Sequence, residues 1–382
     1  MLEENRINTG FFSETVSETF SCFGNGFGND SESRFRNTFY IWTIMYHVTI
    51  KDIARKLNVA VSTVSRAFND KYDINKDTRD LILKTAAEMG YRPNPIAKKL
   101  IQRRTYNIGV IVPEFINSFF PEVILGIQKV LLEKKYQVFI TSSNENPETE
   151  KENIMTMEDN MVDGIIISLS NETSNSNYIT KMVKEGFPVV MFNRVNDEIP
   201  ISKVLFNDYK WAFFATEHLI EQGCRNIYHF SGPQHLSLTK NRINGFRDAM
   251  NKHKLPFTSK QIIETGLFIE DGERVMENLI KNGTIPEAIF SFNDPTAIGA
   301  MKMLKKHKLR IPDDVAIVGF SESKLAPLVE PALTSVIQPT YEMGMQTAHL
   351  LLKQIESDCH AEVETIVLNG KINIRESSVK IK

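Results

Sequence analysis

The sequence predicts a small all-α domain that contains a helix-turn-helix, followed by a much larger α/β body. Apolar residues recur with helical spacing between residues 48 and 90. From residue 106 onward, apolar runs of strand length alternate with amphipathic helical stretches, which is typical of parallel, doubly wound sheets. A chain of 382 residues has room for two or three domains.

The N-terminal segment, residues 1–47, is expected to be a disordered extension. Gly, Asn, Ser and Phe dominate residues 21–33, and residues 1–44 show no hydrophobic periodicity. An alternative is that translation starts at Met45, which lies three residues before Val48, the first residue that we expect to be structured.

Two short helices joined by a tight turn are predicted next. The first has Thr49 as its cap and apolar residues at positions i, i+3, i+4 and i+7: Ile50, Ile53, Ala54 and Leu57. Asn58 suits the left-handed turn that follows. The second helix spans about residues 61–69 and buries Val64 and Phe68. This arrangement is a helix-turn-helix, whose second helix typically enters the major groove of DNA.

A third helix completes the predicted all-α domain. Asn75 is its expected cap, and Gly90 is expected to end it. Ile82, Ala86 and Met89 fall on one face between them.

The charge is distributed unevenly along the chain. The formal net charge is −2, yet residues 48–104 hold 13 Lys and Arg against 6 Asp and Glu, a net +7. Residues 1–47 carry −3 and residues 105–382 carry −6. A basic module fused to a mildly acidic body favours nucleic-acid binding. On charge alone, a solvated pair of basic helices explains the positive charge of residues 48–104 equally well.

The α/β body is predicted from its strands. We expect strands at residues 108–112, 136–140, 164–168, 188–192, 227–230, 288–292 and 315–319, with helices such as 120–133 and 211–222 between them. In parallel sheets of this kind, ligands bind at the carboxyl ends of the strands.

Several classes of protein are disfavoured. Cys22, Cys224 and Cys359 are scattered, and the eight histidines form no cluster with metal-ligand spacing, so we predict no metal site and no cofactor. The sequence has no nucleophile elbow, Walker loop or His-Glu-x-x-His motif, which argues against an enzyme. No apolar run approaches the roughly 20 residues of a membrane span, and the N-terminus does not resemble a secretory signal. We therefore expect a cytoplasmic protein without a membrane partner.

Three stretches together resemble the lactose-repressor/galactose-repressor (LacI/GalR) family. They are Val48-Thr-Ile-Lys-Asp-Ile-Ala, Val64-Ser-Arg-Ala-Phe-Asn69 and Tyr91-Arg-Pro-Asn-Pro-Ile-Ala-Lys-Lys-Leu100. The resemblance implies a homodimer, with a tetramer as an alternative, that binds a near-palindromic double-stranded operator. It also implies a body with the type I periplasmic-binding-protein fold, in which a small-molecule effector binds between two lobes.

The resemblance sets the expected domain boundaries. The helix-turn-helix domain covers residues 48–92, a hinge helix and linker cover 93–105, and the effector-binding and dimerisation domain covers 106–382. Within that domain, the first lobe is expected at about 106–205 and 337–357, and the second at about 206–334 and 361–382.

Roles in DNA binding are carried over position by position. Val61, Ser62 and Arg66 match positions that read base edges, and Arg66 suits a bidentate contact to guanine. Thr49, Thr63, Ser65 and Asn69 match positions that contact phosphates. Ala60 departs from the family, which usually has Ser there, so a helix-capping hydroxyl and a phosphate contact are missing.

The hinge is expected to contact the minor groove through Ala97, Lys98 and Leu100. Asn94 suits a helix cap and Pro95 suits the first helical position. A helix of about seven residues is well below the roughly 12–15 residues that isolated helices need. We therefore expect it to fold only on the operator, where Leu100 wedges between base pairs.

The expected effector site consists of polar and aromatic residues that follow the strands: Asn117, Phe119, Phe120, Asn193, Arg194, Arg242, Phe268, Asn293, Asp294 and Ser321. Ser118 stands where the family has Pro, Asn193 where it has Asp, and Ser321-Glu322 where it has Asp-Asp. The exchanges at Asn193 and Ser321 remove two aspartates, and the first of these often binds sugar hydroxyls in the family. Core packing of the phenylalanines and a structural ion pair at Arg242 are the alternatives.

The sequence therefore predicts a transcription regulator, with repression as the expected mode, that responds to a small molecule such as a sugar or a sugar derivative. Two alternatives remain open: a solute-binding receptor without a role on DNA, and a regulator controlled by a protein partner.

Overall fold

The computed structural model describes residues 48–68, 74–91, 104–170, 174–357 and 362–380. The chain divides into two compact units, Met1–Lys98 and Lys99–Lys382. The predicted extension 1–47 and the hinge residues 93–103 lie outside the described residues. No helix within the described ranges combines the length and the apolar character that a membrane span requires.

The described part of the first unit consists of helices α3 (Ile50–Leu57), α4 (Val61–Phe68) and α5 (Lys76–Glu88). Asn58 ends α3 in the left-handed conformation, with a φ of 51°, and allows α4 to begin three residues later. The buried side chains of the three helices form one small core: Ile53, Ala54, Val64, Ala67, Ile82 and Ala86. The helix-turn-helix prediction is confirmed by this fold.

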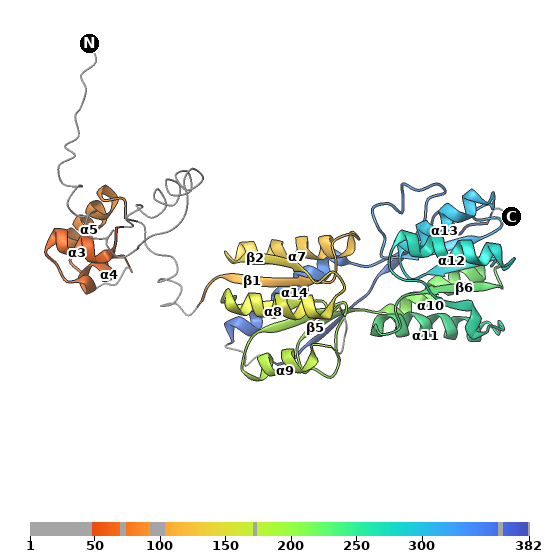
Figure 1. The fold of residues 1–382 in the computed structure, drawn as a ribbon, viewed down its shortest axis with the longest axis horizontal. Coiled ribbons are helices and arrows are strands. Elements are labelled where there is room, and N and C mark those ends of the chain that lie inside the picture. The colour runs from red at the N-terminus through yellow and green to blue at the C-terminus, as the bar shows by residue number, and fades with distance from the viewer. Residues whose placement is uncertain (1–47, 69–73, 92–103, 171–173, 358–361, 381–382) are drawn as a thin grey trace, which may run out of the picture. The chain divides into compact units, whose positions relative to one another are not determined.

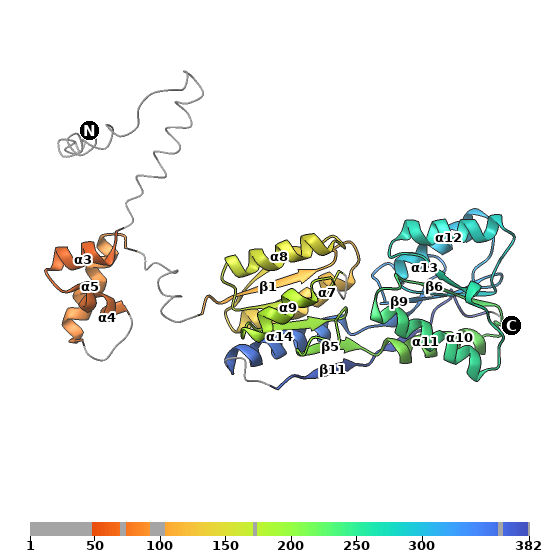
Figure 2. The same cartoon turned by 60° about the horizontal axis from the view of Figure 1, so that its bottom comes forward.

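The second unit is built on two six-stranded sheets (Figures 1 and 2). The sheet of the first lobe has the order β11-β5-β4-β3-β1-β2. Its strands are β1 (Asn107–Val112), β2 (Gln137–Ser142), β3 (Gly164–Ile167), β4 (Val189–Phe192), β5 (Lys203–Phe206) and β11 (Thr365–Leu368). Its helices are α7 (Phe119–Glu133), α8 (Pro147–Asp159), α9 (Ser176–Lys184) and α14 (Thr340–Glu356).

The sheet of the second lobe has the order β12-β10-β9-β8-β6-β7. Its strands are β6 (Ile227–Ser231), β7 (Ile262–Glu264), β8 (Ala288–Ser291), β9 (Ala316–Phe320), β10 (Thr334–Ile337) and β12 (Lys371–Asn373). Its helices are α10 (Asp208–Glu221), α11 (Ser237–Lys252), the short 3-10 helix η2 (Ser259–Gln261), α12 (Ile269–Lys281) and α13 (Asp294–Lys306). All recorded strand pairs of both sheets are parallel except β10 with β12.

The alternation of side chains along each strand places helices on both faces of the sheet. In β1, Ile108, Val110 and Val112 belong to the core that includes residues of α7 and α14. Ile111 belongs to a second core on the opposite face, with residues of α8 and α9. The predicted doubly wound architecture is confirmed by this layering, and each of the seven predicted strands is present to within two residues at either end.

The boundaries of the lobes differ from those expected. Strand β11 pairs with β5 in the first lobe, with Thr365 opposite Lys203, although residues 361–382 were expected in the second lobe. Strand β10 lies in the second sheet as far as Ile337, which was expected in the first lobe. The chain crosses between the lobes after β5, after β10 and after β11, so the last crossing comes later than predicted.

Candidate functional site

Helix α4 has one buried face and one exposed face, as a helix that contacts DNA requires. Val64 and Ala67 are buried in the core of the three-helix unit, whereas Val61, Ser62 and Arg66 are exposed on the other side of the helix. Val61 is 39% exposed although it is apolar, so its side chain is available for contact with a thymine methyl group.

The predicted phosphate-contacting residues lie on or beside the same two helices. Thr49 is exposed at the start of α3, where its backbone N–H donates to Asp52 Oδ2 at 2.9 Å. Thr63 and Ser65 are half-buried on α4. Asn69 and the predicted minor-groove residues Ala97, Lys98 and Leu100 lie outside the described residues.

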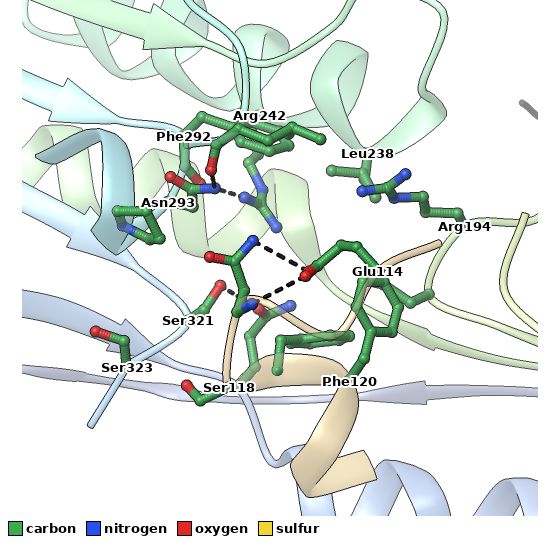
Figure 3. Close-up of a pocket in the computed structure, with 16 residues that line it drawn as sticks. Glu114, Ser118, Phe120, Arg194, Leu238, Arg242, Phe292, Asn293, Ser321 and Ser323 are labelled. Carbon is green, nitrogen blue, oxygen red and sulfur yellow. Dashed lines mark hydrogen bonds between the residues drawn. The ribbon is translucent and has the colours of Figure 1, made fainter. Parts of the chain in front are cut away.

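A pocket lies between the two lobes, where the carboxyl ends of strands from both sheets meet (Figure 3). It encloses about 590 Å³ of empty space, part of which is open to solvent. The first lobe lines it with residues that follow β1 and β4: Glu114, Asn117, Ser118, Phe119, Phe120, Asn193 and Arg194. The second lobe and the crossing after β10 contribute Leu238, Arg242, Leu267, Phe292, Asn293, Pro295, Ser321, Ser323 and Gln338.

Arg242 enters the pocket from helix α11. Its Nε donates to Asp208 Oδ1 at 2.8 Å, and its Nη1 donates to the backbone oxygen of Phe292. Its guanidinium carbon lies 3.7 Å from the ring centre of Phe320 and 4.5 Å from that of Phe292. Burial raises the pKa of the Asp208 carboxyl, and the guanidinium of Arg242 opposes this rise. Arg242 is thus both a lining residue and a member of a buried ion pair.

Arg194 follows β4 in the first lobe. Its Nη1 and Nη2 donate to Glu145 Oε2 and Oε1 at 2.6 and 3.0 Å, in a bidentate pair. Glu145 belongs to the loop between β2 and α8, where it has a φ of 58°. The adjacent Asn193 also has a left-handed φ, of 59°, which Asn tolerates better than most residues.

Glu114 is a buried carboxylate at the edge of the pocket, on the loop that follows β1. It accepts hydrogen bonds from the backbone N–H groups of Ile116 and Asn117 and from Asn117 Nδ2, the last at 3.0 Å. Burial raises its pKa, and these three donors oppose the rise. Its carboxylate therefore fixes the loop that carries Asn117.

The opposite wall contains a turn with unusual backbone angles. Ser321 and Glu322 have φ values of 96° and 54°. Ser321 Oγ donates to Gln338 Oε1 at 2.8 Å, and Gln338 is 4% exposed. Gln338 Nε2 is buried without a hydrogen-bond partner, so a polar ligand in the pocket would satisfy a donor that the protein leaves unused.

Eight of the ten predicted effector residues line the pocket: Asn117, Phe119, Phe120, Asn193, Arg194, Arg242, Asn293 and Ser321. Phe268 does not, because it is half-buried in the small core behind Leu238, Leu267 and Phe292. Asp294 does not either. It is fully buried at the start of α13 and accepts hydrogen bonds from Ser335 Oγ at 2.6 Å and from the backbone N–H of Ser323.

Sequence reasoning missed eight lining residues: Glu114, Ser118, Leu238, Leu267, Phe292, Pro295, Ser323 and Gln338. Ser118, Phe292 and Pro295 each stand next to a predicted residue, and Glu114 lies two residues after the end of the predicted strand 108–112. Leu238 and Leu267 carry no such signal, because a leucine that lines a pocket has the same local sequence pattern as a leucine in the core.

A helix-turn-helix module on a two-lobed, periplasmic-binding-protein-like body defines a class of ligand-responsive DNA-binding regulators. Comparison with known proteins agrees. Residues 105–373 match the family described as periplasmic binding proteins and sugar binding domain of LacI family, and residues 49–94 match bacterial regulatory proteins of the lacI family.

Catabolite control protein A of Priestia megaterium is 31% identical over 333 residues, which cover 87% of this chain and 99% of that protein. The ribose operon repressor of Halalkalibacterium halodurans is 32% identical over 309 residues, which cover 81% of this chain and 90% of that protein. The solved complex of the transcriptional regulator CelR with cellobiose has 27% identity and a TM-score of 0.66, and it covers 86% of this chain and 99% of that one. The chain belongs to the LacI family of bacterial transcription regulators.

Proposed function

We propose that this regulator binds an operator as a homodimer and that a small polar effector, a sugar or a sugar derivative, controls its affinity for that operator. The observation that carries the proposal is the pocket, whose polar and aromatic lining comes from both lobes. The names of two relatives, a ribose operon repressor and a regulator solved with cellobiose, support a sugar. Such a regulator acts in the cytoplasm, where the chromosome lies.

The chemistry of the pocket suits a sugar. Phe119, which is half-buried, provides aromatic surface for the apolar face of a sugar ring, whereas Phe120 is 3% exposed and belongs to the core. Gln338 Nε2 provides an unused buried donor, and Asn117, Ser321 and the remaining N–H groups of the arginines supply further polar contacts.

The proposed mechanism has two states. Because the effector contacts both lobes, it binds more tightly at one angle between them than at another, and it shifts the population toward that angle. The angle sets the spacing of the two hinge segments in the dimer, and hence the fit to two operator half-sites. Operator DNA must then change the affinity for effector by the same factor.

On DNA, we propose that Val61, Ser62 and Arg66 read base edges, which their exposure on α4 supports. Thr49, Thr63, Ser65 and Asn69 contact phosphates and fix the position of the module on the duplex. Ala97, Lys98 and Leu100 remain the proposed minor-groove residues of the hinge.

One experiment tests the effector proposal. An operator is first selected from random duplex DNA, and its affinity for the protein is then measured with each member of a panel of sugars. We expect at least one sugar to change operator affinity and to raise the thermal midpoint of the wild-type chain.

The variant Gln338→Leu keeps the size of the side chain and removes the buried donor. It should lose most of the effect of that sugar while it keeps operator affinity without sugar. Gln354→Leu on helix α14 is the matched control, because Gln354 does not line the pocket. An equal response to the sugar in wild type and Gln338→Leu would place the effector elsewhere.

A further inference from the structure

The positive charges that line the effector pocket are paired with carboxylates, and this pairing limits the charge of the ligands that the pocket can bind. Among its lining residues, Glu114, Arg194 and Arg242 are charged. Two guanidinium groups that face a pocket ordinarily suggest an anionic ligand, such as a phosphate ester or a carboxylate. Whether they attract an anion depends on the groups that already accept their hydrogen bonds.

Arg194 is neutralised from outside the pocket. Its bidentate pair with Glu145, at 2.6 and 3.0 Å, uses the edge of the guanidinium that would bind a carboxylate or a phosphate. Glu145 does not line the pocket, and its side chain is 26% exposed toward solvent, whereas that of Arg194 is 6% exposed. The arginine therefore faces the ligand with its positive charge already paired.

Arg242 is neutralised in the same way by the second lobe. Its Nε and Nη2 lie 2.8 and 2.7 Å from Asp208 Oδ1, and both side chains are almost fully buried. Its Nη1 donates to the backbone oxygen of Phe292, and its planar face lies against the rings of Phe292 and Phe320. The guanidinium retains few N–H groups for a ligand and no uncompensated charge.

Glu114 adds no positive charge to the pocket. If it is ionised, the pocket and the two supporting carboxylates carry a net charge of −1, and if it is protonated they carry none. An anion that enters would lose its hydration without meeting an uncompensated positive charge, at a large cost in free energy. A hydroxyl group loses far less, and it can both accept from the remaining guanidinium N–H groups and donate to a carboxylate.

We propose that the effector is an uncharged, hydroxyl-rich molecule, and that Glu145 and Asp208 are specificity-determining residues that exclude phosphate esters and carboxylates. This inference rests on the proposed function, because it takes the pocket to be the effector site. It adds a property that similarity to sugar-binding regulators does not supply, since both a sugar and its phosphate ester present hydroxyl groups.

The test uses inorganic phosphate as the probe, so that it does not depend on knowing the effector. Phosphate is titrated calorimetrically into the full-length wild-type chain and into Glu145→Gln, at constant ionic strength and pH 7.5. The amide keeps the size of the side chain and removes its charge, which leaves Arg194 unpaired. We expect Glu145→Gln to bind phosphate about tenfold or more tightly than wild type does.

Glu148→Gln is the matched control. Glu148 lies three residues further along, is exposed, and belongs to the first turn of α8, so its replacement removes one negative charge from the same segment without unpairing Arg194. Its phosphate affinity should equal that of wild type. Circular dichroism and the thermal midpoint establish that each variant is folded, and Glu145→Ala repeats the test if the amide variant is not.

Two results would overturn the inference. One is phosphate binding to wild type as tight as to Glu145→Gln. The other is the absence of any gain in both folded Glu145 variants, which would show that the ion pair does not control the charge of the pocket. Failure of the proposed function has a different signature: no sugar changes operator affinity, while the difference in phosphate binding between variant and wild type persists.

Discussion

At the scale of single residues, Asp294 is the most unusual ionisable group near the pocket. It is fully buried, and its carboxyl holds the Ser323 backbone and the Ser335 hydroxyl, so it supports the turn that lines the pocket without facing it. Burial, with a smaller contribution from Glu322, raises its pKa to about 7, and the hydrogen bonds from Ser335 and Ser323 oppose the rise. Glu322 in turn pairs with Arg375.

This shift predicts a pH dependence of stability. Asp294 has an ordinary pKa of 3.8 when unfolded, so between about pH 4 and pH 7 the native state binds the proton that the unfolded state has released. Its contribution to the free energy of unfolding therefore falls as pH rises through this window, by up to about 1.4 kcal/mol per pH unit. Urea unfolding of wild type and Asp294→Asn at pH 5, 6, 7 and 8 measures it.

Asp294→Asn cannot titrate at this position, so the difference between the two curves isolates the aspartate from other buried groups. His229, for example, is fully buried with its pKa lowered to about 3 by burial, and it adds a slope of the opposite sign below pH 6.5 in both proteins. Parallel curves for wild type and variant across pH 5–8 would contradict the shift at Asp294.

A second residue-scale prediction concerns DNA. Arg66→Ala should reduce the preference for operator over scrambled DNA by about 1–3 kcal/mol, the amount expected if the proposed bidentate contact to a guanine is lost. Folding should be unchanged, since Arg66 is exposed on α4. Fluorescence anisotropy with the two duplexes measures the ratio of affinities.

Arg55→Ala is the control for this prediction. Arg55 is also exposed in the helix-turn-helix unit, but it lies on α3 and makes a weak surface pair with Asp52 at 3.6 Å. Its loss should weaken binding to both duplexes by a similar factor. If the two variants change the ratio of affinities equally, Arg66 has no base-reading role.

Half of the residues that line the pocket were predicted from the sequence, because polar residues after apolar strands gather at one edge of a parallel sheet. The rule gives the neighbourhood of a side chain but not its direction. Asn293 and Asp294 are adjacent, yet the first lines the pocket and the second turns into the protein toward Ser335. Gln338 could not be found this way, since it belongs to a crossing segment and not to one of the strands expected from the sequence.

At the scale of elements, glycines let pairs of helices pack closely. A Cβ at Gly126 of α7 would lie 2.1 Å from the backbone oxygen of Tyr341, and one at Gly344 of α14 would lie 2.0 Å from that of Val123. Figure 1 shows α14, in blue, among the orange and yellow elements of the first lobe. Helices α12 and α13 use Gly272 and Gly299 in the same way.

Gly344→Ala should therefore destabilise the first lobe, because the added methyl group meets a backbone atom that cannot move alone. We expect a loss of about 1–3 kcal/mol in the free energy of unfolding, the usual range for overpacking. Urea unfolding followed by circular dichroism measures the loss.

His349→Ala, an exposed change on the same helix, should stay within about 0.5 kcal/mol of wild type. A loss for Gly344→Ala no larger than that of the control would show that the two helices can separate without cost.

Seven strands that stand out as apolar runs were predicted, whereas β5, β7, β10, β11 and β12 were not. The strongly apolar strands, such as β3 and β9, are buried on both faces and stand out as continuous runs. Strands β7 and β12 have three residues each, too few for any period to show. Strand β11 alternates exposed and partly buried residues at the edge of its sheet, so its partner is decided by the topology of the chain and not by its own pattern.

At the scale of the whole molecule, the two units have separate cores. Among the described residues, the core of the helix-turn-helix unit runs from Val48 to Tyr91, and the cores of the body begin at Tyr106. A chain of residues 104–382 should therefore keep the thermal midpoint of the body and its shift with effector. It should lose binding to a mixed pool of duplex DNA, because the helix-turn-helix unit is removed. Calorimetry measures the thermal midpoint, and fluorescence anisotropy measures DNA binding. A thermal midpoint of the truncated chain several degrees below that of the body in the full chain would refute the independence of the cores.

The late return of α14 and β11 to the first lobe has a consequence for the newborn protein. All described core residues of the helix-turn-helix unit have been made once residue 91 leaves the ribosome. The sheet of the first lobe is complete only when its edge strand β11 ends, at residue 368. At about 5–20 residues per second, the interval is roughly 15–55 s. Once β5 has been made, at residue 206, its outer edge stays unpaired until β11 is complete, and α7 lacks α14 until residue 356 has been made. Each new copy therefore completes the core of its helix-turn-helix unit well before the first lobe of its body is complete.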